Sequence, residues 1–287
     1  MKAHAELWNI KEMAVVFEVS RSGYYEFLKG SLSQKAQANE TLLVEIKKSY
    51  AASRRTYGSP RIHKDLCANG HGCSRKRVAR LMREAGISAK MKKKFKVTTK
   101  VDPKLAAAPN HLQQDFKANG PNEKWVSDIT YVWTLEGWLY VAVILDLFSR
   151  KIVGMAMSDR LKKEVVMSAL NQALARRKVS GSLMHHSDKG CQYTSSLFQD
   201  LLKKRGITCS MSGTGNCFDN AVAESFFHTL KTEYIYFETY ETREQAKQSI
   251  FEYVEVFYNN QRRHSFLNYV SPTQFERAYQ MQENISL

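Results

Sequence analysis

The stretch Lys124-Trp125-Val126-Ser127-Asp128-Ile129-Thr130-Tyr131-Val132-Trp133 decides the fold of the larger part of the chain. It is rich in β-branched and aromatic residues, a composition typical of a β-strand. Asp128 stands in the middle of it, and an acid inside a strand is costly to bury unless something compensates its charge. The stretch therefore predicts a sheet that carries a carboxylate among otherwise buried residues.

Further strand and helix patterns follow this stretch. A turn at Glu136-Gly137 leads to strand patterns at 138–146 and 150–157, which predict an antiparallel meander. Amphipathic helices and short strands come next, namely a helix at 162–177, a strand at 183–186, a helix at 195–205, a strand at 207–211, and helices at 220–232 and 242–258. This order indicates an α/β fold with a mixed central sheet.

The positive charge of the chain is concentrated ahead of this region. The net charge is +15, and the segment 54–100 holds 15 lysines and arginines against two acids, Asp65 and Glu84. The rest of the chain is nearly balanced. A concentrated basic segment is the electrostatic footprint of a polyanion-binding protein, because surfaces that only keep a protein soluble mix both signs.

The same segment has the punctuation of a helix–turn–helix over 57–87. We expect Ser59 to cap the first helix, with Pro60 at its first position and Gly70 at its end, and Ser74 to cap the second. A short turn before an arginine-rich helix is the layout of a major-groove reader, although an ordinary basic pair of surface helices is the alternative. The DNA-contact candidates are Arg61, Arg75, Lys76, Arg80 and Arg83.

These patterns divide the chain into five parts. We expect a helical region at 1–53, the basic helix–turn–helix region at 54–100, a linker at 101–117, a core domain at 118–240 and a C-terminal helical extension at 241–287. A lysine run from Lys90 to Lys96 precedes the linker. We expect either a solvated arm or an arm that follows DNA phosphates, and both can hold.

Three acids have the positions of a catalytic site. Asp128 lies within a strand, Asp188 just after a short strand, and Glu224 in the first turns of a helix. Oxygen ligands without a neighbouring Cys or His cluster favour Mg²⁺ or Mn²⁺ over zinc, and two such ions can catalyse phosphoryl transfer. Each acid alone could instead form a salt bridge, a turn or a helix cap, and Asp146 and Asp219 compete for the same roles.

The residues around these acids resemble those of bacterial insertion-sequence transposases that share the retroviral-integrase catalytic core. More narrowly, the chain resembles the second-reading-frame protein of two-frame elements. That family has an Asp-Asp-Glu triad with 35 residues between its last two members, the number that separates Asp188 from Glu224. The matching words are Tyr57-Gly58-Ser59-Pro60-Arg61-Ile62, Trp125-Val126-Ser127-Asp128-Ile129-Thr130-Tyr131, His186-Ser187-Asp188, Gln192-Tyr193-Thr194-Ser195, Gly215-Asn216-Cys217, Asp219-Asn220-Ala221, Glu224-Ser225-Phe226-Phe227, Tyr258-Asn259, Gln261-Arg262-Arg263-His264 and Ser271-Pro272. Gly213-Thr214 departs from the family, which commonly has a basic pair there.

The resemblance implies an RNase H-like catalytic domain with an Asp128, Asp188 and Glu224 triad. The two aspartates would bridge a pair of Mg²⁺ ions, for which Mn²⁺ can substitute, and the glutamate would complete one of them. The implied reaction is nicking at a transposon end by water, then attack of the freed 3′-hydroxyl on another phosphodiester. The family also has a basic residue seven positions after the glutamate, where Lys231 stands on the same helix face. His228 lies between them and is either a DNA contact or a packed or surface histidine.

The resemblance also implies the partners of the chain. They are double-stranded DNA, both terminal repeats and target, and further copies of the chain on paired ends. A first-reading-frame protein is a further candidate partner. Two rivals remain open: a plain nuclease that never joins strands, and a non-enzymatic DNA-binding regulator or assembly subunit of the transposition complex.

Cysteine usage and hydropathy exclude other classes. The chain has five cysteines without a CxxC pair, and no apolar run approaches the roughly 20 residues that span a bilayer. We therefore expect a cytoplasmic protein, and the resemblance implies a bacterial one associated with the nucleoid. His63, Cys67, His71 and Cys73 are spaced unlike a usual zinc finger, so their spacing favours partly buried side chains over a metal site.

Overall fold

The structure, a computed structural model, describes residues 1–30, 33–91, 108–179, 182–213 and 217–285. The chain forms two compact units, Met1–Ser88 and Ala89–Leu287. The lysines at 92–96, residues 101–107 of the expected linker and the glycine-rich loop at 214–216 lie outside the described residues. Within the described ranges, no helix combines the length and the apolar character that crossing a membrane requires.

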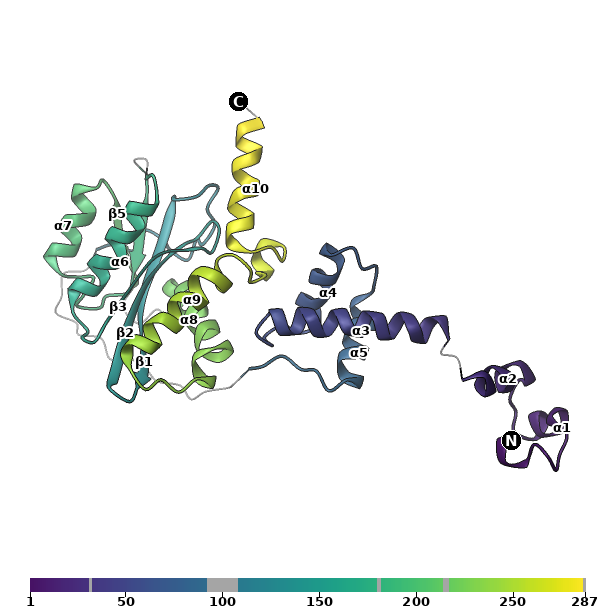
Figure 1. Ribbon diagram of the computed structural model, residues 1–287. Helices are drawn as coiled ribbons and strands as arrows, with labels where there is room; N and C mark the ends of the chain where they lie inside the picture. The colour runs from purple at the N-terminus through teal and green to yellow at the C-terminus, as the bar shows by residue number, and fades with distance from the viewer. Residues whose placement is uncertain (31–32, 92–107, 180–181, 214–216, 286–287) are drawn as a thin grey trace. The chain divides into compact units, whose positions relative to one another are not determined.

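The first unit is entirely helical, as the sequence predicts. Its elements are η1 (Lys2–His4), α1 (Ile10–Val16), α2 (Arg21–Lys29), α3 (Gln34–Ala52), α4 (Ser59–Ala68) and α5 (Arg75–Glu84), which follow one another in Figure 1. The helices α3, α4 and α5 share one core, because each buries an apolar stripe against the others. The stripes consist of Leu42 and Ile46, of Ile62 and Leu66, and of Val78, Leu81 and Met82.

The starts of α4 and α5 differ in how they are capped. The expectation that Ser59 caps α4 is wrong by one residue, because the carbonyl of Gly58 already accepts the amides of Arg61 and Ile62. Ser74 caps α5 as expected, with its Oγ accepting the Arg77 amide at 3.2 Å. The helix–turn–helix punctuation is thus present, with its first helix one residue longer at its start.

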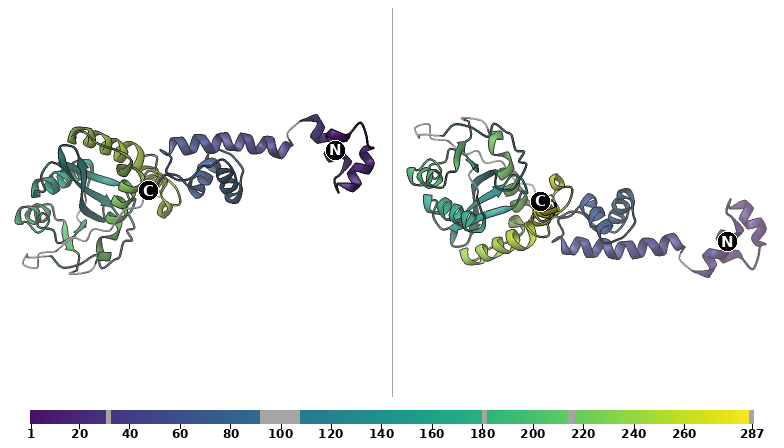
Figure 2. Two further views of the ribbon diagram at one scale, coloured as in Figure 1. Left: turned by 90° about the horizontal axis from the view of Figure 1, so that it is seen from below. Right: turned by 90° about the horizontal axis from the view of Figure 1, so that it is seen from above.

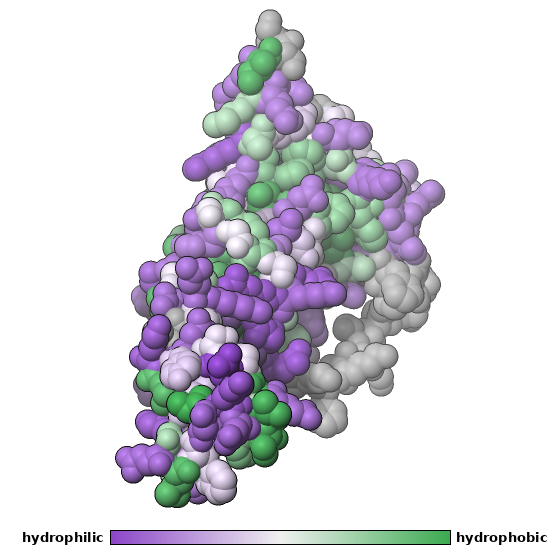
Figure 3. Space-filling model, turned by 90° about the vertical axis from the view of Figure 1, so that its right-hand side faces the viewer, coloured by the Kyte–Doolittle hydropathy of each residue, from purple (hydrophilic) through white to green (hydrophobic). Residues whose placement is uncertain are grey.

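The helices α1 and α2 leave most of their apolar side chains in solvent. Only Met13, Ala14 and Tyr24 are buried there. Green apolar patches lie among purple polar side chains in the lower part of Figure 3. The exposed apolar residues of this segment are Leu7, Trp8, Val15, Val16, Phe17, Val19, Tyr25, Phe27 and Leu28.

The second unit is built around a mixed five-stranded sheet. Its strands are β1 (Lys124–Thr134), β2 (Gly137–Asp146), β3 (Ile152–Ser158), β4 (Met184–Ser187) and β5 (Thr208–Met211). The strand order is β3-β2-β1-β4-β5, with β1, β2 and β3 antiparallel and β4 and β5 parallel to their neighbours. This is the α/β, RNase H-like arrangement that the sequence predicts.

Helices cover both faces of this sheet. The helices α6 (Lys163–Arg176) and α7 (Ser196–Lys204) lie on one face, and α8 (Ala221–Glu233) and α9 (Arg243–Glu252) on the other, as Figures 1 and 2 show. Because both faces are covered, β2 is buried at every position from Val141 to Asp146. At Gly154 of β3 a side chain would lie 2.3 Å from the Ala169 carbonyl of α6, so only glycine permits this close approach.

The C-terminal segment wraps back onto the sheet domain. It comprises η3 (Ile235–Phe237), α9, a π-helical turn η4 (Tyr253–Tyr258), η5 (Ser265–Leu267) and α10 (Pro272–Ile285). Asn259 bonds both the amide and the carbonyl of Ile152 at 3.0 Å, which fixes the segment to β3. Arg262 forms a bidentate, buried ion pair with Glu233 at the end of α8. The segment therefore fixes the C-terminal end of α8.

Residues 108–117, which the sequence predicts as linker, pack on the sheet domain instead. Leu112 is buried, and its amide and that of His111 donate to Ser210 Oγ at 3.1 and 2.9 Å. The segment packs there because its backbone amides and the buried Ser210 hydroxyl satisfy each other's hydrogen bonds.

Candidate active site

The strand register brings two of the three acids onto neighbouring strands, with Asp128 inside β1 and Asp188 directly after β4. The strands β1 and β4 are parallel neighbours, with Val126 opposite His186. Asp128 and Asp188 each come two residues later, and the charge of Asp188 contributes to raising the pKa of Asp128. Each carboxylate also accepts a local backbone amide, Asp128 from Ile129 at 2.8 Å and Asp188 from Gly190 at 3.0 Å.

The helix α8 supplies the third acid, Glu224, from its first turn. The start of this helix is tied to β1, because the side-chain Nδ2 of Asn220 donates to the Ser127 carbonyl at 3.1 Å, next to Asp128. Glu224 itself is exposed and within electrostatic range of the other two acids. The structure thus brings the three predicted acids together from two strands and one helix.

The environment of these acids disfavours their charged forms. Burial, then Asp188 and Glu224, raise the pKa of Asp128 to about 8. Burial also raises the pKa of Asp188, and burial together with Asp188 raises the pKa of Glu224. A carboxylate cluster of this kind becomes favourable when cations lie among its members, since an opposite charge restores the ionised forms. Oxygen ligands of this type suit hard divalent cations such as Mg²⁺.

A basic and an aromatic group lie beside the acids. The ammonium group of Lys231 lies 4.8 Å from the ring centroid of Tyr131 and lowers the pKa of Asp128. Tyr131 in turn packs edge-on against Trp138, which does the same with Trp133. His228, one turn before Lys231 on α8, is exposed. An anion that approached the acids along α8 would meet both side chains.

Three buried side chains lie near the acids, and their contacts could not be predicted from the sequence. Burial, and then Asp128 and Asp188, raise the pKa of Tyr193 well above its ordinary value. His186 contacts Ser210 Oγ with Nδ1 at 2.8 Å and Ser212 Oγ with Nε2 at 3.2 Å, and burial lowers its pKa to about 4. Both histidines before Asp188 are therefore neutral at physiological pH, because burial lowers the pKa of His185 to about 3. In the sequence, only the motifs that contain these three residues pointed to them.

The two competing acids have other partners. Asp219 is fully buried and accepts Asn110 Nδ2 at 2.9 Å and the Gly213 amide at 2.8 Å. Asp146 accepts the amides of Asn122 and Phe148, and burial raises its pKa to about 6. Both carboxylates hold loops in place, which leaves the cluster to the other three acids.

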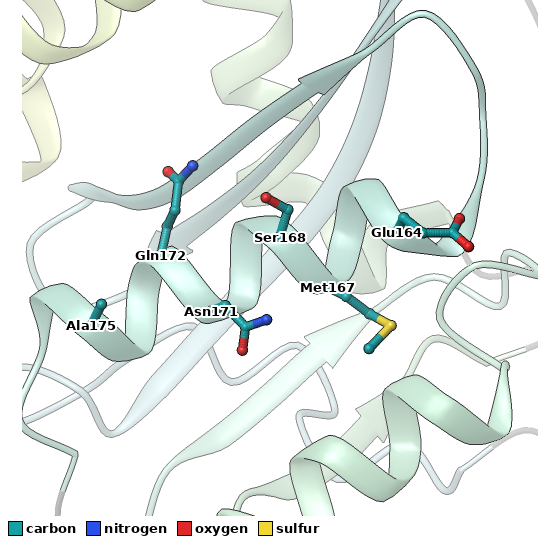
Figure 4. Close-up of a pocket in the computed structure, with 6 residues that line it drawn as sticks. All are labelled: Glu164, Met167, Ser168, Asn171, Gln172 and Ala175. Carbon is teal, nitrogen blue, oxygen red and sulfur yellow. The ribbon is translucent and has the colours of Figure 1, made fainter.

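A shallow depression elsewhere lacks the chemistry of an active site. It runs along the outer face of α6, and Figure 4 shows that all of its labelled residues come from this one helix. Its lining consists of Glu164, Met167, Ser168, Asn171, Gln172 and Ala175. A single carboxylate without a charged partner does not form a catalytic constellation.

The predicted DNA contacts of the first unit lie mainly on α5. Arg75, Lys76, Arg80 and Arg83 are exposed, whereas Arg77 is half-buried and donates to Asn39 of α3 at 2.8 Å. Arg61 of α4 is half-buried too, with its guanidinium 5.6 Å from the ring centroid of Tyr57. The exposed face of α5 is therefore the basic surface available to a polyanion.

Comparison with known families assigns both units. Two family models, each described as an integrase core domain, match residues 118–217 and 224–279, and an HTH-like domain matches 37–95. The chain is 43% identical to the insertion element IS600 uncharacterized 31 kDa protein of Shigella sonnei, over 93% of this chain and 98% of that protein. It is 40% identical to the transposase InsF for insertion sequence IS3A of Escherichia coli strain K12, over 96% of each chain.

Solved structures resemble the chain more distantly. A simian T-cell lymphotropic virus intasome in complex with PP2A regulatory subunit B56 gamma aligns with 76% of this chain and 74% of that one, at 16% identity and a TM-score of 0.47. The HTLV-2 integrase catalytic core domain in complex with magnesium, in its trimeric form, aligns with 56% of this chain and 99% of that one, at 15% identity and a TM-score of 0.44. Likenesses at this level carry no argument about the site.

Proposed function

The chain belongs to the family of insertion-sequence transposases with an integrase core domain, and we propose that it nicks and joins DNA at the acids Asp128, Asp188 and Glu224. The observation that carries this proposal is the convergence of three carboxylates whose pKa values are all raised. The Ile129 and Gly190 amides and Lys231 favour the charged forms, but they do not offset burial and mutual repulsion, so cations among the acids would restore ionisation.

The donor set fits a pair of Mg²⁺ ions, with Mn²⁺ as substitute. All three proposed ligands are carboxylates. The two histidines nearest Asp188 in sequence are buried: His186 contacts Ser210, and His185 packs against the rings of Tyr193 and Phe198. Such ions, when bound, activate the attacking oxygen and stabilise the leaving one. The raised pKa values imply that the carboxyl groups give up protons when the ions bind.

The remaining groups of the chain position the DNA. Lys231, with its ammonium group beside Asp128, attracts the phosphate that is to be cut, and His228 on the same face of α8 is a second contact. In the first unit, α5 enters the major groove with Arg75, Lys76, Arg80 and Arg83, and Arg61 supports it from α4. Water attacks first, and the freed 3′-hydroxyl attacks the second phosphodiester.

The partners follow from this chemistry. We propose that the DNA consists of the element's terminal repeats and a target, and that copies of the chain act together on paired ends, with a first-reading-frame protein as a further partner. Action on chromosomal DNA assigns the protein to the bacterial cytoplasm, at the nucleoid.

The test is an oligonucleotide assay with a labelled terminal repeat and Mg²⁺. The wild-type chain is expected to release a 3′-hydroxyl at the element end and to join it to target DNA. Asp188→Asn is expected to bind the same DNA and to do neither, while Asp200→Asn, an exposed change on α7, is expected to retain both. Cleavage without joining would favour the nuclease, and binding without either reaction in the wild type would favour the regulator.

A further inference from the structure

A histidine and two cysteines converge at the turn between α4 and α5. Their ligand atoms, His63 Nε2, Cys67 Sγ and Cys73 Sγ, all lie within 4.8 Å of one another. His63 Nε2 lies 3.5 Å from Cys67 Sγ and 3.0 Å from the Cys73 carbonyl oxygen. Among the described residues, no other three His, Cys, Asp or Glu side chains are grouped this closely, the acids of the proposed active site included.

The local sequence explains the convergence. His63 and Cys67 are four residues apart on α4, so they lie on one face of the helix. The chain then reverses at Gly70, whose φ of +83° strongly favours glycine, and returns Cys73 to the same face. Cys73 directly precedes Ser74, the N-cap of α5. The cluster therefore joins the body of α4 to the start of the basic helix.

His71 does not belong to the group, although it lies in the same turn. Its Nε2 lies 3.8 Å from Glu45 Oε2 on α3. The spacing that argues against a zinc finger includes this fourth residue. Without it the pattern is different: two ligands one helical turn apart and a third from the following turn.

The His63–Cys67 distance and the ligand chemistry of the group match a tetrahedral zinc ion. Zinc binds thiolate sulfur at about 2.3 Å and imidazole nitrogen at about 2.0 Å. Adjacent ligand atoms of a tetrahedron then lie about 3.5 Å apart, as His63 Nε2 and Cys67 Sγ do. Cys67 is exposed and the other two side chains are half-buried, so solvent can reach the group. Burial raises the pKa of Cys73, and neighbouring Cys67 adds to this, so two thiolates need a cation between them.

We propose that His63, Cys67 and Cys73 bind a zinc ion that fastens the start of α5 to α4, with water in the fourth position. Binding displaces one proton from each thiol, while the imidazole moves its proton from Nε2 to Nδ1, so two protons leave for each zinc ion bound. The site is a structural one within the DNA-binding unit, distinct in ligand type and place from the proposed catalytic acids.

Cobalt substitution tests this directly on the full-length chain. The metal-free, reduced protein is titrated with Co²⁺ in excess Mg²⁺, which occupies carboxylate sites, and thiolate-to-cobalt charge transfer is read in the near ultraviolet. The expected result is a charge-transfer band that saturates at one equivalent of cobalt, disappears when Zn²⁺ displaces it, and accompanies a rise in Tm. Glu224→Gln is expected to give the same cobalt band, so this test is independent of whether the proposed catalytic function is correct.

Matched cysteine variants identify the ligands. Cys67→Ser is expected to lose the band and the rise in Tm while its far-ultraviolet circular dichroism stays that of the wild type, because Cys67 is exposed. Cys191→Ser, which removes an exposed thiol of the other unit, is expected to keep both. The proposal is overturned by absence of the band in the wild type, by its survival in Cys67→Ser, or by a Cys67–Cys73 disulfide that forms in place of metal binding.

Discussion

The acid cluster predicts that cation binding depends steeply on pH. In the metal-free protein, burial and Asp188 raise the pKa of Asp128 to about 8, so this carboxyl is largely protonated at neutral pH. A divalent cation must displace that proton, and affinity must therefore fall as the pH falls. With a pKa of about 8, Asp128 is about half ionised at pH 8 and about 1% ionised at pH 6, so its protonation alone weakens binding about 50-fold between these pH values. The raised pKa values of Asp188 and Glu224 act in the same direction and steepen the dependence.

Calorimetric titration with Mn²⁺ measures this effect, because Mn²⁺ prefers carboxylates to thiolates. Titrations at several pH values give the affinity, and buffers with different ionisation enthalpies give the protons released. Asp128→Asn is expected to bind more weakly at pH 8 and to lose most of the pH dependence. An affinity that stays constant between pH 6 and pH 8, or binding without proton release, would refute this electrostatic account of the site.

Three other predictions concern the framework and the DNA surface. Glu233→Gln leaves the buried guanidinium of Arg262 without its ion pair and is expected to lower the free energy of unfolding in urea by about 3–5 kcal/mol. Arg176→Gln, at a partly exposed pair with Glu255, is expected to lower it by less than about 1 kcal/mol, and equal losses would contradict a structural role for the buried pair. Gly154→Ala forces β3 away from α6 and is expected to lower the free energy of unfolding by about 1–3 kcal/mol, and with it the Tm. An unchanged Tm would disprove the close approach. Lys76→Gln is expected to reduce the salt slope of DNA affinity by about 1, and an unaltered slope would remove Lys76 from the DNA surface.

The strands and helices were predictable where the pattern of side chains is periodic. The strand around Asp128 and the helix around Leu170 carry strong local signals, and the structure has both. The end of the predicted helix 242–258 is a π-helical turn instead, because the chain must bring Asn259 to the backbone of Ile152. Contacts between residues about a hundred positions apart leave no mark on local periodicity.

The grouping of the three acids was predictable from the motifs that the chain shares with the transposase family, whereas their electrostatic surroundings were not predictable. Spacing alone leaves Asp219 equal to Asp188, and only the fold shows that Asn110 and the Gly213 amide engage it. Likewise, Arg77 looks like the other basic residues of its helix in sequence, but it donates to Asn39. Partners that are distant in sequence decide which charges are available for function.

The most direct test of the account is whether the chain joins element ends, and whether Glu224 is needed. A plasmid that carries the gene between its native flanks and terminal repeats is supplied with the wild-type chain, Glu224→Gln, or the exposed control Glu238→Gln, and joined ends are amplified across the junction. A first-reading-frame protein is co-expressed in a parallel set. Junctions are expected with the wild type and the control in at least one set, and none with Glu224→Gln in either. Junctions at wild-type frequency with Glu224→Gln would contradict this expectation.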